Sequence, residues 1–198
     1  MKTKTLLIVI AMLLTIGCKQ QTHQDGIEAM AREKMEYIEK KGFPSIQKQI
    51  VNNLKYPESY EPISTDMSIV TSDMIIFNTH AFIDLRYLER DTREFNEKYG
   101  NDSTSQEARN ALHAMQTMKD NALYICKAVS KRPREFEGIN VYHQFYANDR
   151  PGHKAKKGYH IIFHKDNTTT MLCDHDEYLR IKAFAKELLK DTPYSINL

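Results

Sequence analysis

The sequence predicts an α+β fold: a sheet of about four antiparallel strands packed on several helices, one of them long. Three observations predict this fold. Residues 104–131 carry apolar side chains at helical spacing, strand-like segments follow one another after Pro133, and the amphipathic helices need a surface that buries their apolar faces. The short links between the later strands make the C-terminal half of the sheet a meander. A chain of 198 residues with 41% hydrophobic side chains has the size of one domain.

The N-terminal part of this domain is expected to be helical. Ile27, Met30, Lys34 and Ile38 are three or four residues apart. Glycine and proline at residues 42–44 are expected to end this helix and to open a second one over residues 45–54. Alternating apolar side chains then predict extended chain over residues 60–77, which adds an edge strand to the sheet.

Two helices are predicted in the middle of the chain. Asn78 or Thr79 is expected to cap a helix over residues 80–99, and Ser103 or Thr104 the long helix that reaches about residue 131. Pro133 ends the long helix. Its apolar stripe has regular helical spacing and consists of Ala108, Ala111, Leu112, Met115, Met118, Ala122, Ile125, Cys126 and Val129.

Three strands and a final helix are predicted after Pro133. The strands cover residues 139–148, 159–164 and 168–173, and a tight turn over residues 165–167 joins the last two. The polar residues 150–157 are expected to form a loop. Asp174 or Asp176 is expected to begin the last helix.

The first 17 residues have the pattern of a secretory signal peptide. Lys2 and Lys4 precede an apolar run from Leu6 to Ile16, which as a helix is only about 16 Å long and too short for a bilayer core of about 30 Å. Gly17 and Cys18 follow directly. This order resembles a bacterial lipobox, although Thr15 stands where leucine is usual, and it predicts lipidation of Cys18. The alternative is an ordinary signal peptide cleaved nearby.

The predicted organisation is therefore a signal peptide over residues 1–17, a lipidated cysteine and tether over residues 18–26, and one α+β domain over residues 27–198. Cleavage before Cys18 leaves 26 of the 28 basic side chains against 26 acidic ones. A balanced charge argues against a nucleic-acid partner. The expected location is the cell envelope, on the outer membrane and facing the periplasm, with the lipid anchor as the membrane contact.

Histidines are the first candidates for a site. Of the eight in the chain, His143, His160, His164 and His175 fall in or next to the predicted strands. His160 and His164 lie on one face of a strand about 13 Å apart, which is too far for both to bind one metal ion. A pairing of His160 with His143 on the neighbouring strand is geometrically possible. A second possible group is His164 with Asp174 and His175 at one end of the sheet. No His-Glu-x-x-His or Cys-x-x-Cys spacing accompanies them, so no metal or other cofactor is expected.

Cys126 and Cys173 remain if Cys18 is lipidated. An exported pair is able to form a disulfide, and a strand that ends at Cys173 would be placed to pack on the long helix that carries Cys126. The alternative is two buried thiols that act as small hydrophobic groups. A nucleophile pair of Cys173 with His175 or His164 is the least supported reading, because no orienting third residue accompanies it.

Two surface features are candidate binding residues. Arg150, Lys154, Lys156 and Lys157 form a basic segment that would suit an anionic glycan, a lipid headgroup or an acidic partner. A solvated loop that prevents strand pairing is the alternative. Tyr142 and Tyr146 lie on the strand face opposite the apolar residues and would form a contact surface. A second basic group contains Lys131, Arg132 and Arg134.

Two phrases of the sequence resemble a group of small lipoproteins of unknown function from Gram-negative gut bacteria. Asn53 to Pro62 (NLKYPESYEP) matches the first phrase of that group, and His143 to Asp149 (HQFYAND) matches a strand phrase, with Tyr146 in place of an arginine. The resemblance spans residues 44–173. It implies a domain of unknown function and brings no catalytic residue with it.

The function that these observations predict is a lipid-anchored envelope protein that binds a protein or a glycan without catalysis. We find no catalytic constellation, glycosidase pair, phosphate-binding loop or dinucleotide fingerprint in the sequence. One alternative is a periplasmic carrier of a small apolar ligand between sheet and helices. Another is a metal-dependent hydrolase that uses the histidines.

Overall fold

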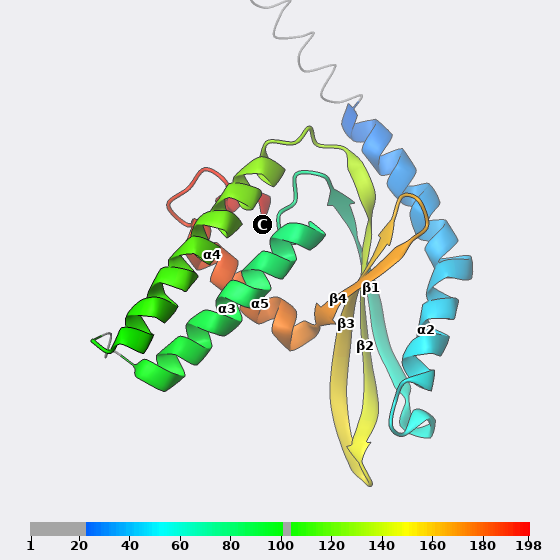
Figure 1. The fold of residues 1–198 in the computed structure, drawn as a ribbon. Coiled ribbons are helices and arrows are strands. Elements are labelled where there is room, and N and C mark those ends of the chain that lie inside the picture. The colour runs from blue at the N-terminus through cyan, green and yellow to red at the C-terminus, as the bar shows by residue number, and fades with distance from the viewer. Residues whose placement is uncertain (1–22, 101–103) are drawn as a thin grey trace, which may run out of the picture.

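The computed structural model describes residues 23–100 and 104–198, which form a four-stranded antiparallel sheet with helices on both faces (Figure 1). The strands are β1 (Glu61–Thr71), β2 (Phe136–Arg150), β3 (His153–His164) and β4 (Thr169–Asp174), and they lie in the order β1-β2-β3-β4. The predicted α+β class, the C-terminal meander and the added edge strand are confirmed.

One face of the sheet is covered by a continuous helical segment of residues 23–52. It consists of helix over residues 23–37, the π-helical turn η1 (Ile38–Gly42) and α2 (Phe43–Asn52). The predicted break at Gly42 and Pro44 is wrong. The Phe43 N–H bonds to the Ile38 carbonyl five residues back, and this wider turn accommodates Pro44 in the first turn of α2, where a missing N–H costs little.

The side chains between this segment and the sheet form the first hydrophobic core. The helical segment contributes Ile27, Ala31, Ile38 and Ile50, and the sheet contributes alternate residues of its two central strands. Gly42 allows close approach here, since a Cβ at this position would lie 2.9 Å from Cε1 of Phe163. The sheet residues of this core are Phe136, Ile139, Val141, Phe145, Ala147, Ile161 and Phe163.

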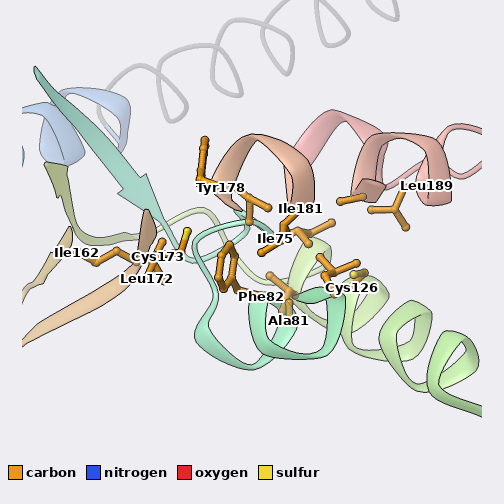
Figure 2. Close-up of a cluster of buried hydrophobic side chains, with 14 residues drawn as sticks. Ile75, Ala81, Phe82, Cys126, Ile162, Leu172, Cys173, Tyr178, Ile181 and Leu189 are labelled. Atoms are coloured by element: carbon orange, nitrogen blue, oxygen red, sulfur yellow. The ribbon is translucent and has the colours of Figure 1, made fainter. Parts of the chain in front are cut away.

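The other face of the sheet packs against α3 (Thr79–Tyr99), α4 (Gln106–Ser130) and α5 (His175–Leu189). Asn78 caps α3 and Asp174 caps α5, which confirms one of the two alternatives predicted for each helix. For α4 the cap is Ser105, whose Oγ accepts from the Ala108 N–H, and not Ser103 or Thr104. Ser103 lies outside the described residues. The second core, drawn in Figure 2, joins these helices to Ile162, Leu172 and Cys173 of the sheet.

Two predicted boundaries are wrong. β1 ends at Thr71, because residues 72–77 are bonded as a loop: the Ser72 N–H donates to the Glu135 carbonyl, and the Ile75 N–H donates to that of Asn197 at 2.8 Å. This loop buries Ile75 and Ile76 completely. The predicted polar loop 150–157 is mostly strand, since Gly152, with a φ of 71°, closes a tight turn and β3 begins at His153.

Candidate functional site

A cleft lies where β2 and β3 extend beyond the first turn of α5. The helix leaves the sheet at Asp174, and the part of β2 and β3 beyond this point is not covered by α3, α4 or α5 (Figure 1). The cleft has a volume of about 680 Å³. It is lined by Tyr142, Gln144, Lys156, Lys157, Gly158, Tyr159, Asp174, His175, Asp176 and Arg180.

The floor of the cleft is built on Tyr142 and Gly158. Gln144 pairs with Gly158 across β2 and β3, and Tyr142 pairs with His160. A Cβ at Gly158 would lie 2.9 Å from Cε2 of Tyr142 and 3.3 Å from Cβ of His175. The absence of a side chain at residue 158 is therefore what lets the Tyr142 ring lie across β3 toward α5.

A row of hydrogen-bonded polar side chains connects the sheet to this cleft. Asn140 Nδ2 donates to Ser68 Oγ at 3.2 Å, and its Oδ1 lies 3.2 Å from Nδ1 of His160. Nε2 of His160 lies 3.1 Å from Nδ1 of His175, at the start of α5. His160 is 5% exposed, while His175 lines the cleft. Asn140 and His160 of the sheet thus hold His175 in place at the wall of the cleft.

The row fixes which nitrogen of each ring carries a proton. Because Asn140 Oδ1 only accepts, Nδ1 of His160 carries its proton and Nε2 accepts. His175 Nδ1–H then donates to this Nε2. Burial, with the charges of His175 and Lys182 acting in the same direction, lowers the pKa of His160 to about 4, so this ring is neutral near pH 7.

Aromatic stacking holds the same rings in place. Tyr142 stacks on His160 with 4.7 Å between centroids and on His175 with 4.3 Å. Tyr178 stacks on His160 at 3.9 Å. His175 is therefore restrained by a hydrogen bond and a ring contact before any ligand arrives, which reduces the entropy lost on binding.

The rim of the cleft carries basic side chains without acidic partners. Lys156, Lys157 and Arg180 form no ion pair within the described part of the chain. Asp174 is the cap of α5, where it accepts from the Glu177 N–H at 2.8 Å. Asp176, the other acidic residue of the lining, accepts no hydrogen bond from a described residue. The cationic side chains of the lining outnumber its carboxylates.

The structure divides the predicted basic segment and tyrosine pair. Lys156 and Lys157 line the cleft, whereas Lys154 pairs with Glu61 at 2.5 Å and lies over the Tyr146 ring at 4.7 Å. Arg150 ends β2 at the hairpin tip. Tyr142 and Tyr146 share a strand face, but Tyr142 packs against the histidines and only Tyr146 is exposed. The group of Lys131, Arg132 and Arg134 follows α4 and does not line this cleft.

The four candidate histidines do not form one cluster: only His160 and His175 contact each other. His143 pairs with Tyr159 rather than His160, and its ring lies on the opposite face of the sheet against Phe43, so the pairing of His143 with His160 that the sequence left open does not occur. His164 hydrogen-bonds to Thr170 Oγ1 at 2.9 Å. In residues 23–100 and 104–198, no three His, Cys, Asp or Glu side chains gather in a way that would hold a metal ion.

The two cysteines are free thiols, and no disulfide joins them. Both belong to the second core, but Figure 2 shows Cys173 beside Leu172 on the sheet and Cys126 away from it, on α4. Burial raises the pKa of Cys126 to about 11 and that of Cys173 to about 12. The structure therefore agrees with the alternative, in which the two cysteines are buried thiols. A buried thiol with a raised pKa is a poor nucleophile, so the structure does not support a catalytic role for Cys173.

The two phrases that resemble the lipoprotein group lie against each other. The Tyr60 hydroxyl is 2.8 Å from Nε2 of His143, and the Tyr60 ring lies 5.2 Å from that of Phe145. Ser59 Oγ accepts from the Asn148 N–H at 2.8 Å. Both phrases therefore serve the packing of β2 against the chain that enters β1.

Sequence reasoning missed several residues of the cleft. Gly158, Gln144 and Arg180 line it, and Asn140 orients His160, but none of them was a candidate. Gly158 had a usable signal, because a glycine inside a strand marks close approach of another group. For the other three, the pairing register was needed.

Comparison of the chain with protein-family models, curated proteins and solved structures found no match. Among the described helices, none is both long enough and apolar enough to span a bilayer. The predicted signal peptide and Cys18 lie outside the described residues, as do residues 19–22 of the predicted tether.

Proposed function

We propose that the chain is a lipid-anchored protein of the cell envelope, on the outer membrane and facing the periplasm, that binds an anionic partner in this cleft without catalysis. The observation that carries the proposal is the set of Lys156, Lys157 and Arg180 around the cleft, with no ion pair to any described residue. Unpaired cations around a concave surface attract an anion and raise its rate of encounter.

The restrained aromatic groups support binding in the same place. Tyr142 and His175 present ring edges and polar atoms that are already fixed by stacking at 4.3 Å. Gln144, which bonds to the Tyr142 hydroxyl, adds an amide to the floor. A few placed polar groups beside an aromatic surface give a binding site its orientation and selectivity.

The two alternatives have less support. A carrier of an apolar molecule needs a hollow of at least about 300 Å³ between sheet and helices. The hollow between α2 and β3–β4, lined by Ile50, Leu54 and Ile161 among others, measures about 220 Å³, and a larger hollow of about 490 Å³ is lined by residues of α3, α4 and α5 and of the segment after α5, and by no sheet residue. A hydrolase would need a nucleophile or a metal ion beside His175. Among the described residues, the His175 ring is hydrogen-bonded to another histidine, His160, and not to a nucleophile.

Binding is tested by titrating ¹⁵N-labelled protein with two polyanions, a glutamate-rich peptide and an oligogalacturonate. We expect shifts confined to signals of the cleft, at least about tenfold weaker binding in Lys156→Glu, and little change in Lys48→Glu, an exposed lysine of α2 on the other face of the sheet. Equal loss in both variants, or no binding of either polyanion, would contradict the proposal.

Anchoring is tested separately. We expect cells that express the full chain to incorporate an alkyne analogue of palmitate into the protein, and Cys18→Ser to abolish the label and release the protein from the membrane fraction. Membrane association of Cys18→Ser equal to that of the unaltered protein would contradict lipid anchoring.

A further inference from the structure

β3 extends past the end of β4 beside the cleft, and this part of its outer edge is paired with no other strand of residues 23–100 and 104–198. β4 pairs with β3 only from Tyr159 to Phe163, and the chain then turns away into α5 at Asp174. Residues 153–158 of β3 pair with β2 on their other side. Among the described residues, no strand pairs with this stretch from the side of β4.

The register identifies the backbone groups that face this edge. The His164 N–H donates to the Thr168 carbonyl, on the side of β4. The pairing of β3 with β2 is regular from Lys154 to His164, and alternate residues of a strand direct their N–H and C=O to the same side. Lys154 and Lys156 therefore present N–H and C=O groups to the open edge.

The side chains along this edge determine which strand could pair there. Lys156 and Lys157 have no ion-pair partner in the described part of the chain, whereas Lys154 is paired with Glu61. Two copies of the chain paired through this edge would bring these lysines together, which disfavours a second copy. An acidic strand has the complementary charge.

From these observations we infer that the partner is an acidic segment of another polypeptide, which adds as a strand to the outer edge of β3 at residues 154–158. This inference rests on the proposed function and specifies its ligand. Such a segment would continue the line of β4. Its alternate side chains would point into the cleft beside Lys156 and Tyr142, and the others toward Lys157.

A strand that adds to β3 forms backbone hydrogen bonds, whereas simple attraction between charges does not require them, so the test probes backbone pairing. The probe is a ten-residue peptide of alternating glutamate and valine, compared with the same peptide carrying N-methyl groups on every second residue, which cannot complete a ladder of hydrogen bonds. We expect the first peptide to slow hydrogen exchange at the amides of Lys154 and Lys156, and the N-methylated one to bind about tenfold or more weakly.

A pair of variants tests the same point on the protein. Lys156→Pro removes the outward N–H at an edge position, where proline is tolerated, and Lys156→Ala removes the same charge but keeps the N–H. We expect the proline variant to bind the peptide about three- to tenfold more weakly than the alanine variant. Circular dichroism of both variants shows whether they fold, and the exchange measurement on the unaltered protein is independent of them.

The outcomes distinguish the inference from the proposed function. Binding of both peptides with equal affinity and without amide protection overturns strand addition and leaves anion binding intact. Failure of both peptides and of oligogalacturonate overturns both. Protection of Lys154 and Lys156 that depends on protein concentration without peptide would make a second copy the occupant, and would also overturn the inference.

Discussion

His160 and His175 share a hydrogen bond of 3.1 Å between Nε2 and Nδ1, which joins a buried residue of the sheet to a residue of the cleft wall. Burying a polar row beneath a cleft is costly unless every member is bonded. Here Ser68, Asn140 and both histidines are bonded in sequence. The orientation of His175 is thus built into the folded chain, as the proposed binding role requires.

The buried His160 predicts a loss of stability in mild acid. Its pKa is about 4 in the folded protein against 6.5 when exposed, so the unfolded chain binds more protons between these values. Stability is fully present above pH 6.5 and falls as the pH is lowered toward 4. The loss from this residue reaches about 3 kcal/mol, and His143, whose pKa burial also lowers, acts in the same direction.

The measurement is urea unfolding at pH 7 and at pH 4.5, together with an NMR titration of the His160 ring. In His160→Gln we expect a smaller difference between the two pH values, since His143 alone remains of these two buried groups. A His160 ring that titrates near pH 6.5 would contradict the burial that the structure gives it.

Gly158 predicts a local clash at the cleft floor. In Gly158→Ala the added Cβ would meet the Tyr142 ring at 2.9 Å and Cβ of His175 at 3.3 Å. We expect a loss of about 1–3 kcal/mol in unfolding free energy and displaced NMR signals of both rings.

The matched control for this prediction is Gly26→Ala, where an added Cβ meets nothing within 4 Å. Because residue 26 is helical, alanine is expected to leave stability unchanged or to raise it by up to about 1 kcal/mol. If the two alanine variants were equally stable, the close approach at Gly158 would be disproved.

The buried thiols predict unreactive cysteines. Since burial raises the pKa values of Cys126 and Cys173 to about 11 and about 12, neither is a thiolate at pH 8. We expect a thiol reagent to label neither residue in the folded protein and to label both in urea without a reducing agent. Labelling in urea only after reduction would show that the two thiols are bridged after all.

The parts of the fold that follow from local patterns were predictable. The three C-terminal strands, the stripe of α4 and the caps Asn78 and Asp174 all follow from periodicity or from side chains next to their own helix. The continuous helix through Pro44 was not predictable, because the π turn that precedes the proline packs at Gly42 against Phe163 in another part of the chain.

The site depended on pairing register, which the sequence left open. Placing His143 one residue out of line with His160 puts the two rings on opposite faces of the sheet. The same register brings Tyr142 over Gly158 and His160 against the start of α5. Because no local pattern specifies which residues of two strands face each other, the candidates could be named but not grouped.

The contact between Tyr60 and His143 gives the last prediction. The Ser64 carbonyl accepts from Nδ1 of His143, so Nε2 accepts from the Tyr60 hydroxyl, which in turn accepts from Gln47 Nε2 at 2.8 Å. His143 is 1% exposed, and removing the hydroxyl leaves its Nε2 without a hydrogen-bond partner among the described residues. We expect Tyr60→Phe to lower the unfolding free energy by about 1–3 kcal/mol.

The control is Tyr56→Phe in the same phrase, because the Tyr56 hydroxyl forms no hydrogen bond with any described residue and its ring packs against Lys55. That change is expected to stay within about 0.5 kcal/mol. Adding His143→Phe to Tyr60→Phe should cost less than the two single changes together, since the unsatisfied nitrogen is removed with its ring. Additive losses would mean that the two phrases are not coupled through this bond, and that their contact is packing alone.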